Sequence, residues 1–318
     1  MRVAALACLV ALVLSSAGIV PAAAQTDAGA TVLRIATTAD DNSVPVLFAQ
    51  RTGRFKAAGL DVQIQQVANG AAIAAGIAGG SYDIGKASLT SILTAHLRGI
   101  PFTIVGPAGI YDAKAPYGVL LVPSDSPVHT AKDLEGATLA SGGLNSIDEV
   151  AVRAWMERNG ADQRTVHFVE IPQSAQQAAL EAHRISGAVT NRPQLDAALA
   201  GGKVRVLAPV FTAIAPTFMS SGWFATTDWA DKHPEALARF LRVLVDTSRY
   251  ANEHHAETAP ILAAFSGVPL AVIEANPRTI LGTSLDVAAI QPVIDLAAKY
   301  GLLQRPFPAR EVLYVPAR

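Results

Sequence analysis

The stretch that decides the fold reads Gly-Arg-Phe-Lys-Ala-Ala-Gly-Leu-Asp-Val over residues 53–62 and, after a small-residue helix, Tyr-Asp-Ile-Gly over residues 82–85. A second helix then leads to Phe102–Val105. Strand-like runs that alternate with helix-like runs a few residues apart are typical of parallel βαβ units. The same order recurs downstream, where an Ala- and Gln-rich helix at Ser174–Ala182 precedes Ile185–Val189. Two such halves predict an α/β protein of two lobes, with a ligand site at the C-terminal ends of the strands.

The first 24 residues have the order of a secretory signal. A basic start at Arg2 precedes an apolar run over Val3–Leu14 and a small-residue site at Ala22–Ala24. We therefore expect a signal peptide over residues 1–24, cleaved near the bond to Gln25. A membrane anchor is the alternative, but the apolar run is broken before Pro21 and is shorter than the roughly 20 residues that a spanning helix needs.

The only cysteine, Cys8, falls within that segment. The mature protein would then contain no disulfide, no thiolate metal ligand and no cysteine nucleophile. Cys8 does not follow a cleavage site, so a lipid-modified N-terminus is not expected. These features together predict a soluble, freely diffusing protein of the periplasm.

Charge and size limit the partners. Lys and Arg number 25 against 26 Asp and Glu, and loss of Arg2 leaves 24 against 26, with no basic block. Nucleic acid is not an expected partner, because neutralising phosphates requires clustered Lys and Arg. The chain has 318 residues, of which 51% are hydrophobic. At about 100 to 200 residues per domain, this length predicts two domains.

Two crossings between the lobes are expected, at Gly106–Pro116 and near Pro216–Ala225. We expect one lobe to consist of residues 31–115 and 225–318, and the other of residues 116–224. The helices after residue 225 should pack back on the first lobe and so make it discontinuous. The protein is predicted to be a monomer.

Polar side chains occupy four turns that lead from a strand into a helix: Thr37–Ser43, Lys86–Ser88, Ser141–Ser146 and Asn191–Arg192. Unpaired N–H groups at each helix start favour an anion or a carbonyl or sulfonyl oxygen. For any one turn the alternative is a helix cap, but four turns on one cleft favour a ligand site. The candidate ligand-binding residues are Thr38, Asp41, Asn42, Lys86, Ser88, Tyr111, Ser141, Asn145, Ser146, Asn191 and Arg192.

Arg192 is the leading candidate among these residues. A micromolar ligand needs about 8 kcal/mol, whereas a helix-terminus contact gives roughly 0.3 to 1 kcal/mol, or up to about 2 when partly buried. A bidentate guanidinium contact with a carboxylate or sulfonate adds about 1.5 to 3 kcal/mol per charged hydrogen bond. The alternative for Arg192 is a surface residue beside a proline. Tyr111 could line the site, although core or hinge packing is the commoner role for such a residue.

Catalytic and metal motifs are absent from the sequence. It contains no Gly-x-Ser-x-Gly elbow, His-Glu-x-x-His helix, Walker loop or Gly-x-Gly-x-x-Gly turn. His254 and Glu257 are one helical turn apart but lack the further ligands of a zinc site. We therefore expect no metal, no cofactor and no enzymatic activity.

Several motifs together carry a family resemblance: Gly53–Val62, Asp83–Gly85, Lys132–Gly136, the Gly/Ser turn after Ala140 and Lys232–Glu235. In this order the chain resembles the solute-binding proteins of nitrate/sulfonate/taurine-type and thiamine-pyrimidine-precursor-type ABC importers. The resemblance spans nearly the whole mature chain. It implies a type II periplasmic-binding-protein fold, with two α/β lobes, two crossover segments and a ligand cleft between them. Two departures, at His183–Gly187 and Asn191–Pro193, imply that the ligand differs from the best-known ones of the family.

The function implied is that of an extracytoplasmic component of an ABC importer, which captures a small anionic organic solute by hinge closure and passes it to an inner-membrane permease. One alternative is an enzyme of pyrimidine-precursor synthesis on the same fold. Those enzymes resemble this family but depend on a cysteine-rich segment that this chain lacks. Another alternative is a sensor that presents its ligand to a receptor kinase. Sulfonates, carboxylates, nitrate-like anions and pyrimidines all remain open as ligands.

Overall fold

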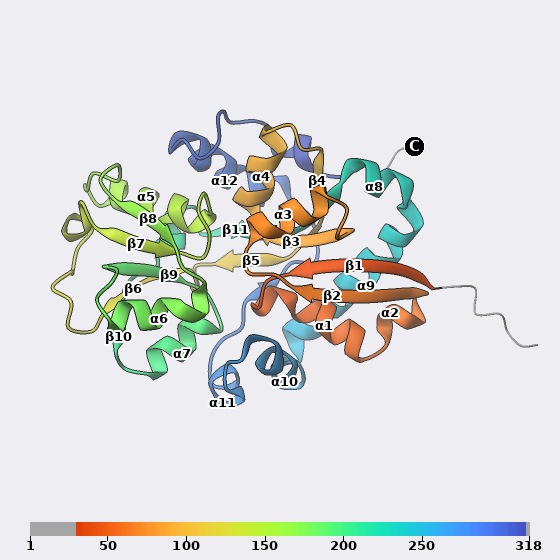
Figure 1. Cartoon of the computed structure of the whole chain (residues 1–318), viewed down its shortest axis with the longest axis horizontal. Helices are drawn as coiled ribbons and strands as arrows, with labels where there is room; N and C mark the ends of the chain where they lie inside the picture. The colour runs from red at the N-terminus through yellow and green to blue at the C-terminus, as the bar shows by residue number, and fades with distance from the viewer. Residues whose placement is uncertain (1–29, 316–318) are drawn as a thin grey trace, which may run out of the picture.

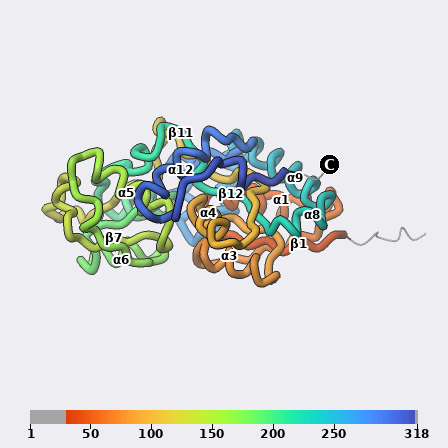
Figure 2. The backbone as a smooth tube through the Cα atoms, turned by 90° about the horizontal axis from the view of Figure 1, so that it is seen from above, coloured from red at the N-terminus to blue at the C-terminus, as the bar shows by residue number. Residues whose placement is uncertain are grey.

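The computed structural model describes residues 30–315 (Figure 1). The expected signal peptide and its cleavage site lie outside these residues. Two five-stranded sheets stand side by side, each with its own helices, and a small three-stranded sheet lies between them. Viewed from above, the two bodies occupy opposite ends of an elongated molecule (Figure 2).

The first sheet has the strand order β2-β1-β3-β12-β4. Its strands are β1 (Thr31–Thr37), β2 (Leu60–Gln66), β3 (Ile84–Ser88), β4 (Phe102–Pro107) and β12 (Ser221–Thr226). Its helices are α1 (Val44–Arg51), α2 (Arg54–Ala57), α3 (Gly70–Ala78), α4 (Leu89–Leu97), α8 (Thr227–Lys232) and α9 (Pro234–Glu253), with the 3-10 turn η1 (Asp41–Ser43) before α1. Sequence periodicity favours one helix from Val44 to Phe55, but Gly53 adopts a left-handed φ of 73° that divides it.

The second sheet has the order β10-β6-β9-β7-β8. Its strands are β6 (Val119–Pro123), β7 (Thr138–Ser141), β8 (His167–Glu170), β9 (Gly187–Thr190) and β10 (Val204–Ala208). Its helices are α5 (Ile147–Arg158), α6 (Gln173–Glu181) and α7 (Gln194–Ala200), with 3-10 turns η2 (Lys132–Leu134) and η3 (Val210–Ala213). As in the first sheet, parallel strands alternate with helices, as the sequence predicts.

A connecting sheet of order β11-β5-β13 lies between the two bodies. It consists of β5 (Gly109–Asp112), β11 (Thr217–Met219) and β13 (Ile280–Leu281). The two crossings therefore run side by side as an antiparallel pair, with Phe218 opposite Tyr111. The two crossings are therefore joined by hydrogen bonds between β5 and β11.

The expected limit of the second lobe at residue 224 is corrected by the pairing of β12. This strand pairs with β3 and β4, with Trp223 opposite Lys86 and Phe224 opposite Ile104. Residues 221–224 thus belong to the first sheet. A strand that returns from the far lobe and inserts antiparallel between two parallel neighbours has no local sequence signature, so local patterns place the boundary a few residues late.

The C-terminal helices cover both bodies. They are α10 (His255–Ser266), α11 (Leu270–Glu274) and α12 (Val287–Lys299), followed by the turn η4 (Ala309–Val312). Helix α10 packs on α1, while α12 contacts α4 of the first body and α5 of the second. The Lys299 ammonium lies 2.5 Å from a carboxylate oxygen of Glu157 in α5. The C-terminal segment is therefore not confined to the first lobe.

An aromatic cluster fills the core at the crossings. Tyr111, Tyr117, Phe211 and Phe218 have ring centroids 5.0 to 5.7 Å apart. Gly118, at a φ of 62°, lies against the Phe211 ring so closely that a Cβ atom there would be 2.5 Å from it. Large aromatic area buried at this point stabilises the connecting sheet.

Candidate functional site

A cavity of about 410 Å³ lies between the two bodies, and residues of both line it. Four helix N-termini meet there: α3 and α4 from the first body, and α5 and α6 from the second. A helix start offers N–H groups without intrahelical partners and the positive end of the helix dipole. The polar lining residues at these starts are Asn69, Ser88, Ser91, Ser146, Asp148, Gln173 and Ser174.

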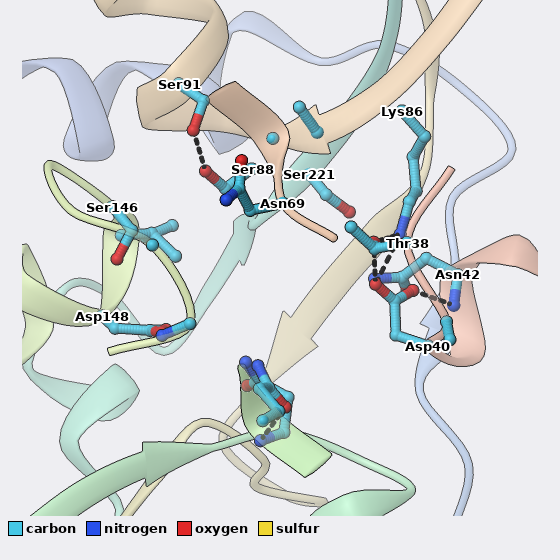
Figure 3. A pocket seen from close by; sticks show the side chains of 18 of the residues that line it. Thr38, Asp40, Asn42, Asn69, Lys86, Ser88, Ser91, Ser146, Asp148 and Ser221 are labelled. Carbon is cyan, nitrogen blue, oxygen red and sulfur yellow. Dashed lines mark hydrogen bonds and ion pairs between the residues drawn. The ribbon is translucent and has the colours of Figure 1, made fainter. Parts of the chain in front are cut away.

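A lysine, a threonine and a carboxylate form one wall of the cavity (Figure 3). Lys86 is only 1% exposed, and its ammonium donates to Thr38 Oγ1 at 2.6 Å and to Asp40 Oδ2 at 2.5 Å. Burial lowers the pKa of Lys86, and the Asp40 carboxylate opposes that shift. The Lys86 and Asp40 charges neutralise one another, so this wall offers a ligand little net charge.

The opposite wall carries Asp148, in the first turn of α5 (Figure 3). Asp148 is 4% exposed, and its Oδ2 atom accepts long hydrogen bonds from Ser141 Oγ at 3.3 Å and Gly142 N at 3.5 Å. Burial raises its pKa to about 6, and hydrogen bonds from Gly142, Ser141 and Asn191 oppose the rise. A carboxylate beside a helix start is favoured by the dipole, and this buried carboxylate also lines the cavity.

Arg192 lines the cavity, but other groups of the protein engage its guanidinium. Nη1 donates to the Pro116 carbonyl oxygen at 2.9 Å. Nε forms an ion pair with Asp196 Oδ2 at 3.2 Å, but the two atoms are not aligned for a hydrogen bond. Burial raises the pKa of Asp196 to about 6, and the Arg192 charge opposes that rise. The prediction that Arg192 supplies a free cation for an anionic ligand is thereby weakened.

Two buried side-chain oxygens on the cavity have no hydrogen-bond donor among residues 30–315: Asn42 Oδ1 and Asn191 Oδ1. Buried polar atoms without partners are uncommon and disfavour the empty state. Both residues are candidates for contact with a bound molecule.

The two bodies also touch beside the cavity. Asn69 Nδ2 donates to Glu170 Oε1 at 2.6 Å, which joins the start of α3 to the end of β8. Gln194 Nε2 reaches the Ala39 carbonyl oxygen at 3.4 Å. In this structure, hydrogen bonds therefore join the two bodies beside the cavity.

Seven of the predicted site residues line this cavity: Thr38, Asn42, Lys86, Ser88, Ser146, Asn191 and Arg192. The turn expected at Lys86–Ser88 is instead the end of β3, because β12 pairs along it and extends the strand. Whether any of these residues contacts a ligand remains a prediction.

The other four predicted residues do not line the cavity. Asp41 is 2% exposed and its carboxylate accepts from Arg278 and from Thr279 N. Tyr111 is fully buried in the aromatic cluster with its hydroxyl 2.6 Å from Thr212 Oγ1.

Ser141 and Asn145 support the cavity wall from behind. Ser141 is fully buried and its hydroxyl lies 2.7 Å from Ser146 Oγ. Asn145, at a φ of 56°, donates its N–H to Glu149 Oε1 at 2.8 Å. Both residues hold the start of α5 in place, which is the capping role weighed against binding in the sequence.

Sequence reasoning missed several lining residues, among them Asp40, Asn69, Ser91, Asp148 and Gln173. Asn69 could have been found, because an Asn before a small-residue helix is a typical N-cap, and its Oδ1 accepts from Ala72 N at 2.9 Å. Asp148 gives no such signal, because an acidic residue in a first helical turn is common on any surface helix.

Within residues 30–315, no group of three or more His, Cys, Asp or Glu side chains is arranged to hold a metal ion. No helix of the same residues is both long enough and apolar enough to cross a membrane.

Comparison with known proteins gives three kinds of similarity. A family model described as "NMT1/THI5 like" matches residues 40–258. An aliphatic sulfonates-binding protein of Escherichia coli (strain K12) is 24% identical over 245 residues, which are 75% of each chain. The alkanesulfonate-binding protein SsuA from Xanthomonas axonopodis pv. citri, solved bound to MOPS, has a TM-score of 0.73 at 21% identity and covers 89% of this chain and 98% of its own.

The periplasmic nitrate-binding protein NrtA from Synechocystis PCC 6803 has a TM-score of 0.72 at 14% identity. The match covers 89% of this chain and 84% of that one. These likenesses confirm the predicted type II periplasmic-binding-protein fold.

Proposed function

This chain belongs to the NMT1/THI5-like family, and we propose on that premise that it is a binding protein that captures a small organic solute between its two lobes. The family assignment confirms the resemblance to sulfonate- and nitrate-type solute-binding proteins. As in those relatives, the solute would pass to an ABC permease in the membrane, and the protein would act in the periplasm. We propose a non-catalytic role, because the relatives are binding proteins.

One observation carries this proposal: a single cavity is bounded by helix N-termini from both lobes, while the crossings between the lobes are paired as a hinge. A solute held by both walls at once binds the closed arrangement better than the open one. It therefore shifts the population of the two states toward closure. The convergent N–H groups favour a solute with an acidic or carbonyl oxygen.

A thermal-shift screen of small organic solutes tests the proposal, together with mass spectrometry of any solute released from the purified protein. A ligand present at 100 times its Kd stabilises the folded state by about 2.7 kcal/mol. Small-angle scattering with a stabilising solute should show compaction. If no solute stabilised the protein and none was released from it, the binding role would be wrong.

A matched pair of variants places binding at this cavity. Leu144 lines the cavity and is 48% exposed, whereas Leu199 in α7 is 37% exposed and does not line it. Leu144→Trp should obstruct the cavity and reduce affinity by tenfold or more, while Leu199→Trp should leave affinity unchanged. Equal affinity in both variants would place the ligand elsewhere.

A further inference from the structure

Four charged side chains line the cavity, and one of them has no ion-pair partner within residues 30–315. Lys86 pairs with Asp40, and Arg192 pairs with Asp196 behind the wall. Asp148 has no Lys, Arg or His nitrogen within 4.0 Å in the described structure. The uncompensated charge of the cavity is therefore negative and lies on α5.

The surroundings of Asp148 give its carboxylate hydrogen bonds but no cation. The hydrogen bonds from Ser141 and Gly142 are 3.3 and 3.5 Å long, and both go to Oδ2. The Asn191 side chain also hydrogen-bonds to Asp148 and so lowers the pKa of the carboxyl, while the buried Oδ1 of Asn191 has no donor. A buried carboxylate without a cation, next to an amide oxygen without a donor, describes a position that a hydrogen-bond-donating group would occupy.

We propose that Asp148 is a specificity-determining residue, which selects solutes that carry a donating nitrogen and place it against the Asp148 carboxylate and Asn191 Oδ1. This inference rests on the proposed binding function and adds the class of solute. The nitrogen belongs to an amine, an amidine or an amino-substituted ring, and the helix starts receive the acceptor end of the same molecule. A simple anion is disfavoured, because at this wall it would meet a buried negative charge that no cation offsets.

The sign of the pH dependence separates the two classes of solute. Burial raises the pKa of Asp148 to about 6 in the unliganded protein. A donating nitrogen binds the ionised carboxylate, so affinity should be highest above pH 6 and fall as the pH drops below it. A simple anion would bind beside the protonated carboxyl, and its affinity should rise as the pH drops.

The pH test must distinguish the titration of Asp148 from the titration of its neighbours. Glu149, next to it in α5, is the charged neighbour that acts on Asp148, and the facing groups from β7, β9 and the loop after β7 are Ser141, Asn191 and Gly142. Asp196, with a pKa also raised to about 6, titrates in the same range but pairs with Arg192. Asp196→Asn removes this second titration but also frees the Arg192 charge at the cavity, so only the shape of its pH profile is compared with that of the wild type.

The experiment compares matched probes that differ in one amino group: 2-aminoethanesulfonate with ethanesulfonate, 3-aminopropanoate with propanoate, and an aminopyrimidine with pyrimidine. Affinities are measured by calorimetry from pH 5 to pH 8 for the wild type, Asp148→Asn and Glu149→Gln. Glu149 is a fair control, because it is buried beside Asp148 but does not line the cavity.

We expect the amino-bearing member of a pair to bind at least tenfold more tightly. Asp148→Asn should reduce its affinity roughly 10- to 100-fold, the range for a hydrogen bond to a charged group, and should flatten the pH profile. Glu149→Gln should leave the preference for the amino-bearing member unchanged and should move the pH profile to lower pH without flattening it, because burial and the Glu149 charge both raise the pKa of Asp148 and the variant removes that charge. Tighter binding of the amino-free member, or unchanged affinity in Asp148→Asn, would overturn the role of Asp148 while leaving the binding function intact. Absence of binding by every probe and of any solute released from the protein would overturn the binding function and this inference together.

Discussion

Replacing Arg278 should destabilise the protein severely, although this residue lies outside the cavity lining. Its Nε donates to Asp41 Oδ1 at 2.6 Å, and the Thr279 N–H donates to Asp41 Oδ2 at 2.7 Å. The two charged side chains are only 7% and 3% exposed. Arg278→Met leaves the Asp41 carboxylate buried without its cation, and breaking such a pair typically costs 3 to 5 kcal/mol, so we expect a loss of about 4 kcal/mol.

Urea unfolding measures this loss as a lower transition midpoint at an unchanged m-value. Arg164→Met is the matched control, because Arg164 pairs with Asp162 at the surface with 80% and 38% of the side chains exposed. Its expected cost is about 1 kcal/mol or less. Asp41→Asn combined with Arg278→Met should recover most of the loss, because no unpaired charge is then buried. Costs for Arg278→Met and Arg164→Met that agree within error would refute the reasoning.

Three further changes test the charges and contacts around the cavity. Burial raises the pKa of Asp148 from 3.8 to about 6. Above pH 6, ionisation of Asp148 therefore lowers the free energy of unfolding by up to about 3 kcal/mol. This cost disappears as the pH falls toward 4. Asp148→Asn should accordingly raise the free energy of unfolding at pH 7.5 but not at pH 4, and a gain that does not depend on pH would contradict this. Glu170→Ala removes the 2.6 Å hydrogen bond with Asn69 between the lobes. We expect scattering to give a larger radius of gyration for the unliganded protein, while the free energy of unfolding falls by less than about 0.5 kcal/mol. An unchanged radius would show that this contact does not hold the lobes together. Arg192→Ala leaves Asp196 buried without its cation and should lower the midpoint of urea unfolding. Adding Asp196→Asn should restore the midpoint. If calorimetry gave the same solute affinity for Arg192→Ala as for the wild type, Arg192 would not be part of the binding site.

The repeating part of the fold could be predicted because its signals are local. Helix α5 begins at Ile147, directly after the turn at Ser141–Ser146 that the sequence places before a helix. Strand β9, at Gly187–Thr190, overlaps the run expected at Ile185–Val189. Short connections and alternating periods determine such elements from neighbouring residues alone.

The antiparallel strand β12 could not be predicted in the same way. Its partners β3 and β4 precede it by more than 100 residues, and the pairing of Trp223 with Lys86 depends on the return crossing. This single insertion moved the lobe boundary and turned the expected Lys86–Ser88 turn into a strand end. Contacts between distant segments, rather than local preference, decided both outcomes.

Charge in the cavity was the hardest feature to predict, because the sequence shows which residues are charged but not which charges cancel. Arg192 and Asp196 are spaced i, i+4, which is a common ion-pair spacing, yet only the structure shows that both are buried and so committed to one another. Lys86 is neutralised by Asp40, which lies 46 residues away. Because both pairs cancel, the unpaired charge on the cavity wall of the described structure is that of Asp148. Its negative sign is opposite to the positive charge that Arg192 leads one to expect.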